Sequence, residues 1–241
     1  MAMDSFIYHR VCGYAATLAI LLGNTVYLDA SLRRTMAIYP DLKIYTHLEP
    51  RYLTVWNAIF QIVNASIGLY IDLRTLQGRS DMVPKQLTKF KHTFFNAIVF
   101  PYTVLVFTLF WPIFLYDRNL VFPTRADLFV PKISNYIMHG FILFVALWDL
   151  VFQEWNFVSS HRKNCLYIFG MYCAYNSVLF FTKYGDIGLW PYQILTVLEG
   201  SIFFPLFFLH IFITLYVSYF LQWRIKNGFA ALTEKLSLKK I

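Results

Sequence analysis

The chain has 241 residues, of which 58% are hydrophobic, 20% aromatic and only 14% charged. Soluble domains typically carry about 25% charged residues, so this composition excludes an ordinary soluble domain and indicates a polytopic membrane protein. The formal net charge of +8 does not indicate nucleic-acid binding, because most Lys and Arg lie in short loops and tails beside long apolar runs. Basic residues at such positions set the orientation of a membrane protein and contact lipid headgroups.

Six apolar runs follow one another, and each has about the length, roughly 18 residues or more, that a helix needs to cross a bilayer. They cover residues 9–28, 52–71, 93–115, 133–153, 165–182 and 193–222. The first run exceeds the roughly 7–15 apolar residues of a signal-peptide core and is expected to remain as a helix. The sequence shows no internal repeat. It therefore predicts an all-α fold, a single membrane bundle of six transmembrane helices over residues 1–241, with a basic tail over 223–241.

Basic residues also predict the orientation of this bundle. Six spans place both termini on one side of the membrane, and that side carries more Lys and Arg than the other. The positive-inside rule then favours cytoplasmic termini. The sequence does not distinguish the endoplasmic reticulum from the plasma membrane, and it leaves the oligomeric state open.

The second apolar run carries a polar stripe. Within "RYLTVWNAIFQIVNASIGLYIDL", Thr54, Asn57, Gln61 and Asn64 are three or four positions apart and share one side of an α-helix. Two interpretations are open. The polar side chains could bond neighbouring helices, at about 0.6 kcal/mol each on average. Alternatively, the stripe forms one wall of a polar chamber within the membrane.

Further polar groups are expected at the depth of Thr54, because the second, fourth and sixth helices enter from the same face. Asn135 lies near the start of the fourth run with His139 one turn deeper, and Glu199 lies about two turns into the sixth. At 1.5 Å of rise per residue these groups fall within roughly 10 Å of one level. Ionisable groups in a bilayer usually face the bundle interior, so His139 and Glu199 are predicted to point inward. Near the opposite boundary, solvated helix-end groups are expected at Asp72, Asp149 and Glu154.

Several catalytic and nucleotide-binding motifs are absent from the sequence, which narrows the chemistry that these groups could perform. The sequence contains no GxSxG elbow, HExxH motif, P-loop or GxGxxG, and its three cysteines have no metal-ligand spacing. A hydroxyl becomes a nucleophile when a base lies within hydrogen-bond reach, and imidazole titrates near neutral pH. By elimination, Thr54 and His139 are candidates for an acyl-transfer site without metal or cofactor. A structural role for His139 remains the alternative.

The segments around Thr54 and His139 resemble the androgen-induced and androgen-dependent family of multi-pass membrane hydrolases. The matching pieces are "YLTVWNAIFQ" and "IDL" in the second run, "SNYIMHG" in the fourth, and "WPYQIL" before the last helix. Tyr136 and Gly140 depart from the family pattern around the histidine. The resemblance implies a threonine nucleophile at Thr54, a histidine partner at His139, and hydrolysis of fatty acid esters of hydroxy fatty acids.

Several other residues are candidates for supporting roles. Asn135, one turn before His139, could orient the imidazole or donate to the oxyanion, and Asn57 is a second candidate donor. Glu199 could hold the imidazole tautomer, as the acid does in a catalytic triad. A substrate tunnel between the helices is expected to be lined by Trp56, Gln61, Phe141, Phe144 and Trp148.

The sequence thus predicts an intramembrane hydrolase of fatty acid esters of hydroxy fatty acids or related lipid esters. Its expected partners are the lipid ester substrate and the bilayer, with no nucleic acid and no metal. The alternative is a lipid or small-molecule transporter or binding protein with a polar intramembrane chamber. Transporters commonly contain inverted repeats, which this sequence lacks. A non-catalytic adaptor is a third possibility that the short loops disfavour.

Overall fold

The computed structural model describes residues 2–153 and 160–238. These residues form helices without strands, and six helical segments are long and apolar enough to cross a membrane. The six segments are Phe6–Ile38, Leu53–Leu76, Lys85–Leu120, Lys132–Phe152, His161–Asp186 and Phe203–Phe229. The predicted all-α membrane fold with six spans is therefore confirmed.

Three of the spans contain a π-turn, one of which, Thr182–Asp186, ends the fifth span. One turn, Phe95–Val99, joins α4 (Lys85–Phe94) to α5 (Phe100–Asp117), and another, Ile137–Phe141, joins α6 (Lys132–Tyr136) to α7 (Ile142–Phe152). The remaining long helices are α1 (Ala2–Ile38), α3 (Leu53–Leu76), α8 (His161–Phe181) and α10 (Phe203–Leu238). Two short helices, α2 (Lys43–Leu48) and α9 (Gln193–Leu198), lie in the connections.

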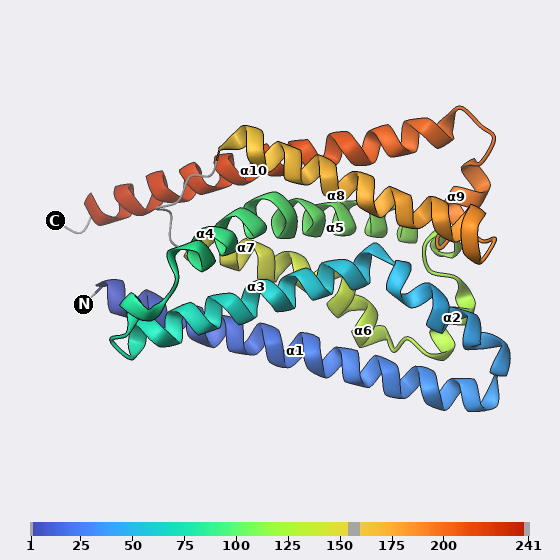
Figure 1. Cartoon of the computed structure of the whole chain (residues 1–241), viewed down its shortest axis with the longest axis horizontal. Helices are drawn as coiled ribbons and strands as arrows, with labels where there is room; N and C mark the ends of the chain where they lie inside the picture. Colours follow the sequence, from blue (N-terminus) through green and yellow to red (C-terminus); the bar gives the residue numbers. More distant parts are fainter. Residues whose placement is uncertain (1, 154–159, 239–241) are drawn as a thin grey trace.

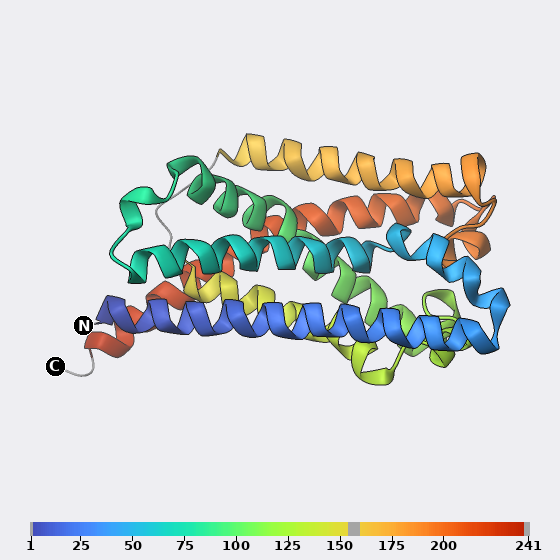
Figure 2. The same ribbon diagram turned by 60° about the horizontal axis from the view of Figure 1, so that its bottom comes forward.

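Both termini lie at one end of the bundle, and α2 and α9 lie at the other (Figure 1). We call the first of these the terminal end and the second the distal end. Figures 1 and 2 show α1 running alongside α3, and these two helices are in direct contact, as are α5 and α10. Large apolar side chains such as Val26 and Leu115 are exposed on the outside of the bundle, as expected where helices face lipid.

The structure differs from the sequence prediction in the sixth apolar run, 193–222. Gly200 has a φ of 81°, a left-handed conformation that residues with a Cβ disfavour. The chain turns there, so α9 ends at Leu198 and the sixth spanning helix begins at Phe203. That helix then continues to Leu238, well into the basic tail predicted over 223–241.

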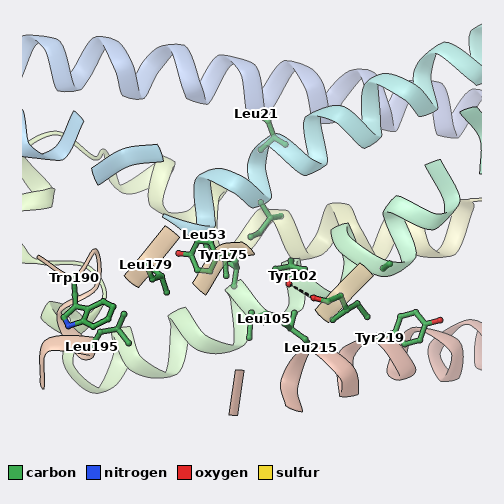
Figure 3. Close-up of a cluster of buried hydrophobic side chains, with 14 residues drawn as sticks. Leu21, Leu53, Tyr102, Leu105, Tyr175, Leu179, Trp190, Leu195, Leu215 and Tyr219 are labelled. Carbon is green, nitrogen blue, oxygen red and sulfur yellow. Dashed lines mark hydrogen bonds between the residues drawn. The ribbon is translucent and has the colours of Figure 1, made fainter. Parts of the chain in front are cut away.

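A buried apolar cluster between α3, α5, α8 and α10 joins the two halves of the sequence (Figure 3). Leu53 and Tyr175 lie close together in this view, although they are far apart in sequence. Tyr102, at 1% exposure, donates from its hydroxyl to the carbonyl oxygen of Ile168 at 3.2 Å. The cluster therefore packs α3 against α8 near the start of α3.

Near the terminal end, the bundle is closed by buried ion pairs. Asp149 accepts hydrogen bonds from Tyr14 at 2.7 Å, Asn64 at 2.6 Å and Lys91 at 3.1 Å. Together these contacts join α1, α3, α4 and α7, because each donor lies on a different helix. Buried charges are tolerated only when they are paired and hydrogen-bonded, and this carboxylate meets both conditions.

A second buried pair lies beside the first. Arg10 donates two hydrogen bonds to Asp72, at 2.9 Å and 2.8 Å. Asp72 and Asp149 are 4% and 2% exposed, so the expectation that they are solvated helix-end groups is wrong. Burial by α1 and α4 could not be deduced from their positions near the ends of apolar runs. Glu154 lies outside the described residues.

Asp149→Ala should lower the free energy of unfolding by about 3–5 kcal/mol, because the buried Lys91 ammonium would lose its carboxylate partner. The measurement is denaturant unfolding of the purified protein in detergent. Asp29→Ala is the matched control, since its carboxylate pairs with Arg33 on the exposed surface of α1, and it should leave the unfolding curve unchanged. Coincident curves for Asp149→Ala and wild type would contradict a structural role for this cluster.

Candidate active site

Thr54 lies in the first turn of α3, at the distal end of the bundle. The preceding turn, Glu49–Arg51, contains Pro50, and Tyr52 is extended with φ −81° and ψ 130°. The extended residue separates the turn from the helix, which begins at Leu53. The hydroxyl of Thr54 is thus carried at the point where the chain re-enters the bundle.

His139 lies in the π-turn between α6 and α7. Turns of this kind inside α-helices are frequently found at functional sites, because they widen the helix and redirect a side chain. The indole Nε1 of Trp111 donates to the carbonyl oxygen of His139 at 2.9 Å. The π-turn is therefore bonded to α5 at the residue that carries the imidazole.

The structure brings Thr54 and His139 together. Thr54 Oγ1 is 3.1 Å from His139 Nε2, and His139 Nδ1 is 3.0 Å from the backbone oxygen of Asn135. A carbonyl oxygen can only accept a hydrogen bond, so Nδ1 carries the proton of the neutral imidazole. Nε2 is then an acceptor for the Thr54 hydroxyl, which is the arrangement that a general base and a hydroxyl nucleophile require.

An aromatic contact fixes the plane of the imidazole. The ring of Phe110 is stacked on His139 with centroids 3.5 Å apart and an angle of 13° between the planes. The ring is thus held by Phe110 on one face, by Asn135 at Nδ1 and by Thr54 at Nε2. These three contacts come from α5, α6 and α3, so the site depends on the packing of three separate spans.

A cavity of about 210 Å³, which we call the distal chamber, lies beside this pair. Thr54, Asn135 and His139 lie in its wall, and the rest of the wall is mainly apolar. Its apolar side chains include Leu28 and Leu32 of α1, Val106 and Leu109 of α5, Leu195 of α9, Phe207 and Phe208 of α10, and Phe122 and Ala126 from the segment between α5 and α6. The chamber therefore places a hydroxyl–imidazole pair inside a mainly apolar enclosure.

The charged side chain in the wall of the distal chamber is Glu49. Burial, together with the nearby carboxylate of Asp29, raises the pKa of Glu49. Of the residues that the structure describes, no Lys or Arg lines the chamber. The chamber is thus better suited to apolar groups than to an anionic group.

The two candidate oxyanion donors have different positions. Asn135 lies in the chamber wall at 7% exposure, and its Oδ1 has no hydrogen-bond partner in the described structure. Asn57 is fully buried between helices, where its Oδ1 accepts from the Thr103 hydroxyl at 2.9 Å. Asn135 is therefore placed to meet a ligand in the chamber, whereas Asn57 is not.

Glu199 makes its hydrogen bonds and its ion pair in the described structure with residues other than His139. It lies in the turn after α9, where Tyr184 donates to its carboxylate at 2.8 Å and Trp190 at 3.1 Å. These two hydrogen bonds lower the pKa of Glu199, and Lys183 at 3.5 Å contributes in the same direction. The turn at Gly200 removes Glu199 from the interior of the sixth span, so the contact with the imidazole expected from helical depth is absent.

The tunnel predicted from aromatic residues does not coincide with the distal chamber. None of the five predicted residues, Trp56, Gln61, Phe141, Phe144 and Trp148, appears in its described lining. Phe144 is 68% exposed on the outside of the bundle, and Trp148 packs edge-on against Tyr14 near the ion pairs. Helical periodicity assigns such residues to a face, but it does not say which neighbouring helix covers that face.

The four polar residues of the α3 stripe have different surroundings along the helix. Gln61 donates to the Thr103 hydroxyl and to the Ile142 carbonyl oxygen, both at 3.0 Å, and Asn64 bonds Asp149. These side chains bond neighbouring helices, as does Asn57. Thr54 alone among the four lines the distal chamber, so the expectation that the whole stripe forms a chamber wall is wrong.

Sequence reasoning missed several residues around the pair. Phe110 lies in a uniformly apolar run that offers no signal for a stacking partner. Tyr175 and Tyr192 also line the chamber, and Tyr192 falls in the "WPYQIL" segment that marked the resemblance. No group of three or more His, Cys, Asp or Glu able to hold a metal ion occurs in residues 2–153 and 160–238.

Comparison with known proteins gives one family. A sequence profile described as "FAR-17a/AIG1-like protein" matches residues 42–227. The chain is 32% identical to the androgen-dependent TFPI-regulating protein of Rattus norvegicus over 151 residues, which are 62% of this chain and 64% of that protein. It is 28% identical to the Homo sapiens protein of that name over 165 residues, 67% of this chain and 70% of that protein.

A further relative is the androgen-induced gene 1 protein of Homo sapiens, which is 29% identical over 99 residues, 39% of this chain and 42% of that protein. The chain spans less than two thirds of the length of the rodent relatives, with 61% of the Mus musculus protein covered. No solved structure gives a significant match.

The tautomer of His139 can be measured directly. In protein carrying ¹⁵N-labelled histidine, His139 should show a protonated Nδ1 and an unprotonated Nε2, because the Asn135 carbonyl requires a donor. Thr54→Val, which removes the hydroxyl but keeps the shape, should shift the Nε2 signal and leave Nδ1 unchanged. A proton on Nε2 at neutral pH would contradict the assignment of His139 as the acceptor for Thr54.

Proposed function

The chain belongs to the FAR-17a/AIG1-like family, and from this membership and the Thr54–His139 contact we propose that it is an intramembrane hydrolase of lipid esters. Thr54 is the nucleophile and His139 is the general base. The observation that carries the proposal is the 3.1 Å contact between Thr54 Oγ1 and His139 Nε2 in the wall of an apolar chamber.

In the first half of the reaction, Thr54 Oγ1 attacks the ester carbonyl carbon while His139 Nε2 takes its proton. The carbon–oxygen bond to the alcohol then breaks, and His139 returns the proton to the departing alcohol oxygen. The product of this half is an acyl ester of Thr54. In the second half, water attacks that ester with His139 again as base, which releases the carboxylic acid and restores the threonine.

The imidazole is oriented by a backbone group in place of a carboxylate. In a Ser-His-Asp triad the acid fixes the tautomer and stabilises the imidazolium. Here the Asn135 carbonyl fixes the tautomer through Nδ1, and Phe110 holds the ring plane. Among the described residues no carboxylate is hydrogen-bonded to His139, so the imidazolium formed during the reaction is stabilised by its hydrogen bond to the Asn135 carbonyl and not by a direct ion pair.

Two donors are available for the oxyanion of the tetrahedral intermediate. The first turn of an α-helix leaves its N–H groups without intrahelical partners, and Thr54 is in that turn. The amide of Asn135 lies in the same wall, and its NH₂ group is the second donor. A backbone N–H and a side-chain amide are the groups that form oxyanion holes in other acyl-transfer enzymes.

The chamber supports a lipid ester as the substrate. An ester between two acyl chains has a small polar centre and long apolar arms, which match a mainly apolar wall that carries Thr54 and His139. The resemblance to membrane threonine hydrolases narrows this class to fatty acid esters of hydroxy fatty acids. The carboxylate of such a substrate belongs outside the chamber, because Glu49 and not a basic residue lines it.

Transport of a lipid is the competing function. A transporter has to open its binding site alternately to the two sides of the membrane. Below the distal chamber, Asn57 and Gln61 bond across the bundle to Thr103, and Lys91 and Asp149 close the terminal end. These buried contacts favour a chamber that opens at one end, as a hydrolase requires.

Thr54→Ala and His139→Ala should each lower hydrolysis of a lipid ester by about 10³-fold or more, because each removes a group that acts in the bond-making step. Thr54→Ser should retain part of the activity, since the attacking oxygen remains. The measurement is fatty acid release by purified protein in detergent or liposomes.

Thr108→Ala, which removes a hydroxyl from the exposed side of α5, is the control. Full turnover by Thr54→Ala would rule out this mechanism, and lipid flux without cleavage by wild type would favour the transporter.

Filling the distal chamber should shorten the acyl chains that the protein accepts. Leu109→Trp places a larger ring in the wall, so hydrolysis of long-chain esters should fall about tenfold or more, in line with the strong effect of misplacing a reacting group. Short-chain esters should be affected less. Leu115→Trp is the control, because Leu115 is 78% exposed on the outside of the bundle. An unchanged chain-length profile for Leu109→Trp would show that the acyl chains bind elsewhere.

A further inference from the structure

Two tyrosines bind the backbone immediately before the proposed nucleophile. The Leu53 N–H donates to the Tyr192 hydroxyl at 2.8 Å, and the Tyr175 hydroxyl donates to the Arg51 carbonyl oxygen at 3.0 Å. The two hydroxyl oxygens are 3.2 Å apart. The contacts involve the residues on either side of Tyr52, within three positions of Thr54.

The direction of each hydrogen bond follows from the groups at the two ends. The Arg51 carbonyl can only accept, so Tyr175 gives it the proton of its hydroxyl. The Leu53 N–H can only donate, so Tyr192 accepts there and gives its own proton to Tyr175. The result is one continuous relay from Leu53 N–H through Tyr192 and Tyr175 to the Arg51 carbonyl. Hydrogen bonds arranged head to tail strengthen one another in a low-dielectric site.

The relay replaces a local helix cap. The residue before α3 is Tyr52, whose side chain makes no capping hydrogen bond, whereas helices usually begin with a Ser, Thr, Asp or Asn that does. Tyr192 supplies the acceptor from 139 positions along the chain. The start of α3 is therefore held by α8 and by the segment before α9, in addition to the local hydrogen bond from Trp56 Nε1 to the Pro50 carbonyl oxygen at 2.8 Å.

Packing holds the two tyrosines in place. Tyr175 is 7% exposed and lies beside Leu53 in the buried cluster of Figure 3. Its ring meets Trp56 edge-on with centroids 5.4 Å apart, and the rings of Tyr192 and Tyr52 are 5.6 Å apart. Both hydroxyls thus have little freedom to leave the backbone groups that they bond.

We propose that Tyr175 and Tyr192 are positioning residues that clamp residues 51–53 and thereby hold the Thr54 hydroxyl on His139 Nε2. This role rests on the proposed hydrolase function. Helix ends fray more readily than helix interiors, and Thr54 is the second residue of α3. A displacement of about 1 Å in a reacting group can lower a rate about 10²-fold, so a clamp at the preceding peptide unit has a direct effect on the reaction.

The test compares Tyr192→Phe and Tyr175→Phe with Tyr102→Phe. All three variants remove one buried hydroxyl, but the Tyr102 hydroxyl bonds the Ile168 carbonyl away from Thr54 and does not line the chamber. The first readout is the rate at which a fluorophosphonate labels Thr54, with Thr54→Ala as the unlabelled reference. The second is kcat and KM for a lipid ester. The third is the ¹⁵N signal of His139 Nε2, which reports the hydrogen bond from Thr54 whether or not the protein is active.

Tyr192→Phe should lower the labelling rate and kcat about tenfold with KM changed less than about twofold, because the nucleophile and not the acyl binding surface is displaced. Its His139 Nε2 signal should move toward that of Thr54→Val. Tyr175→Phe should act in the same direction. The labelling rate and kcat of the double variant should be no lower than those of the more impaired single variant, because the two hydroxyls belong to one relay. Tyr102→Phe should match wild type in all three readouts.

The outcomes separate the clamp from the proposed function. If Tyr192→Phe and Tyr175→Phe keep the wild-type kcat, labelling rate and Nε2 signal, the clamp is wrong while hydrolysis stands. If wild type neither hydrolyses esters nor is labelled, but the Nε2 signal still moves in the tyrosine variants, the proposed function fails while the clamp on Thr54 stands. If Tyr192→Phe does not fold, Tyr175→Phe decides by the same readouts. Equal losses in all three variants, Tyr102→Phe included, would indicate general destabilisation and overturn the clamp.

Discussion

A polar group within the hydrocarbon of a bilayer has no water to bond, so its partner has to come from another part of the protein. One face of α3 shows how this constraint organises the bundle. Asn64 bonds Asp149 near the terminal end, and Gln61 bonds Thr103 and the Ile142 carbonyl in the middle. At the distal end, Thr54 bonds His139. The same physical requirement thus produces helix-to-helix contacts along most of the face and a hydroxyl–imidazole pair at its end.

The two ends of the bundle have different chemistry as a consequence. The terminal end contains paired charges, with Lys91 on Asp149 and Arg10 on Asp72, and holds four helices together. The distal end contains the mainly apolar chamber with the Thr54–His139 pair in its wall. Ionic contacts hold the helices together at one end, and the cavity lies at the other end beside the Thr54–His139 pair.

The sequence predicted the fold class and the number of spans because the length of an apolar run is a local property. Local pattern also placed Thr54 and His139 on inward faces, and the resemblance paired them. Other residues were misplaced for identifiable reasons. Glu199 lies in a continuous apolar run, and the turn at Gly200 that removes it from the membrane interior depends on one backbone angle. Phe144 and Trp148 lie on faces whose covering helices the sequence does not specify.

By itself, the sequence determined where the chain is apolar enough to cross a membrane and which side chains in those spans are polar. Tertiary structure alone decided which of these polar groups meet. The contact between Thr54 and His139, the Asn135 carbonyl that sets the tautomer, and the Tyr175–Tyr192 relay all join atoms whose distance is set by how helices pack. Helical periodicity specifies the direction in which a side chain leaves its own helix. The neighbour that it reaches depends on the rotation and depth of every other helix in the bundle.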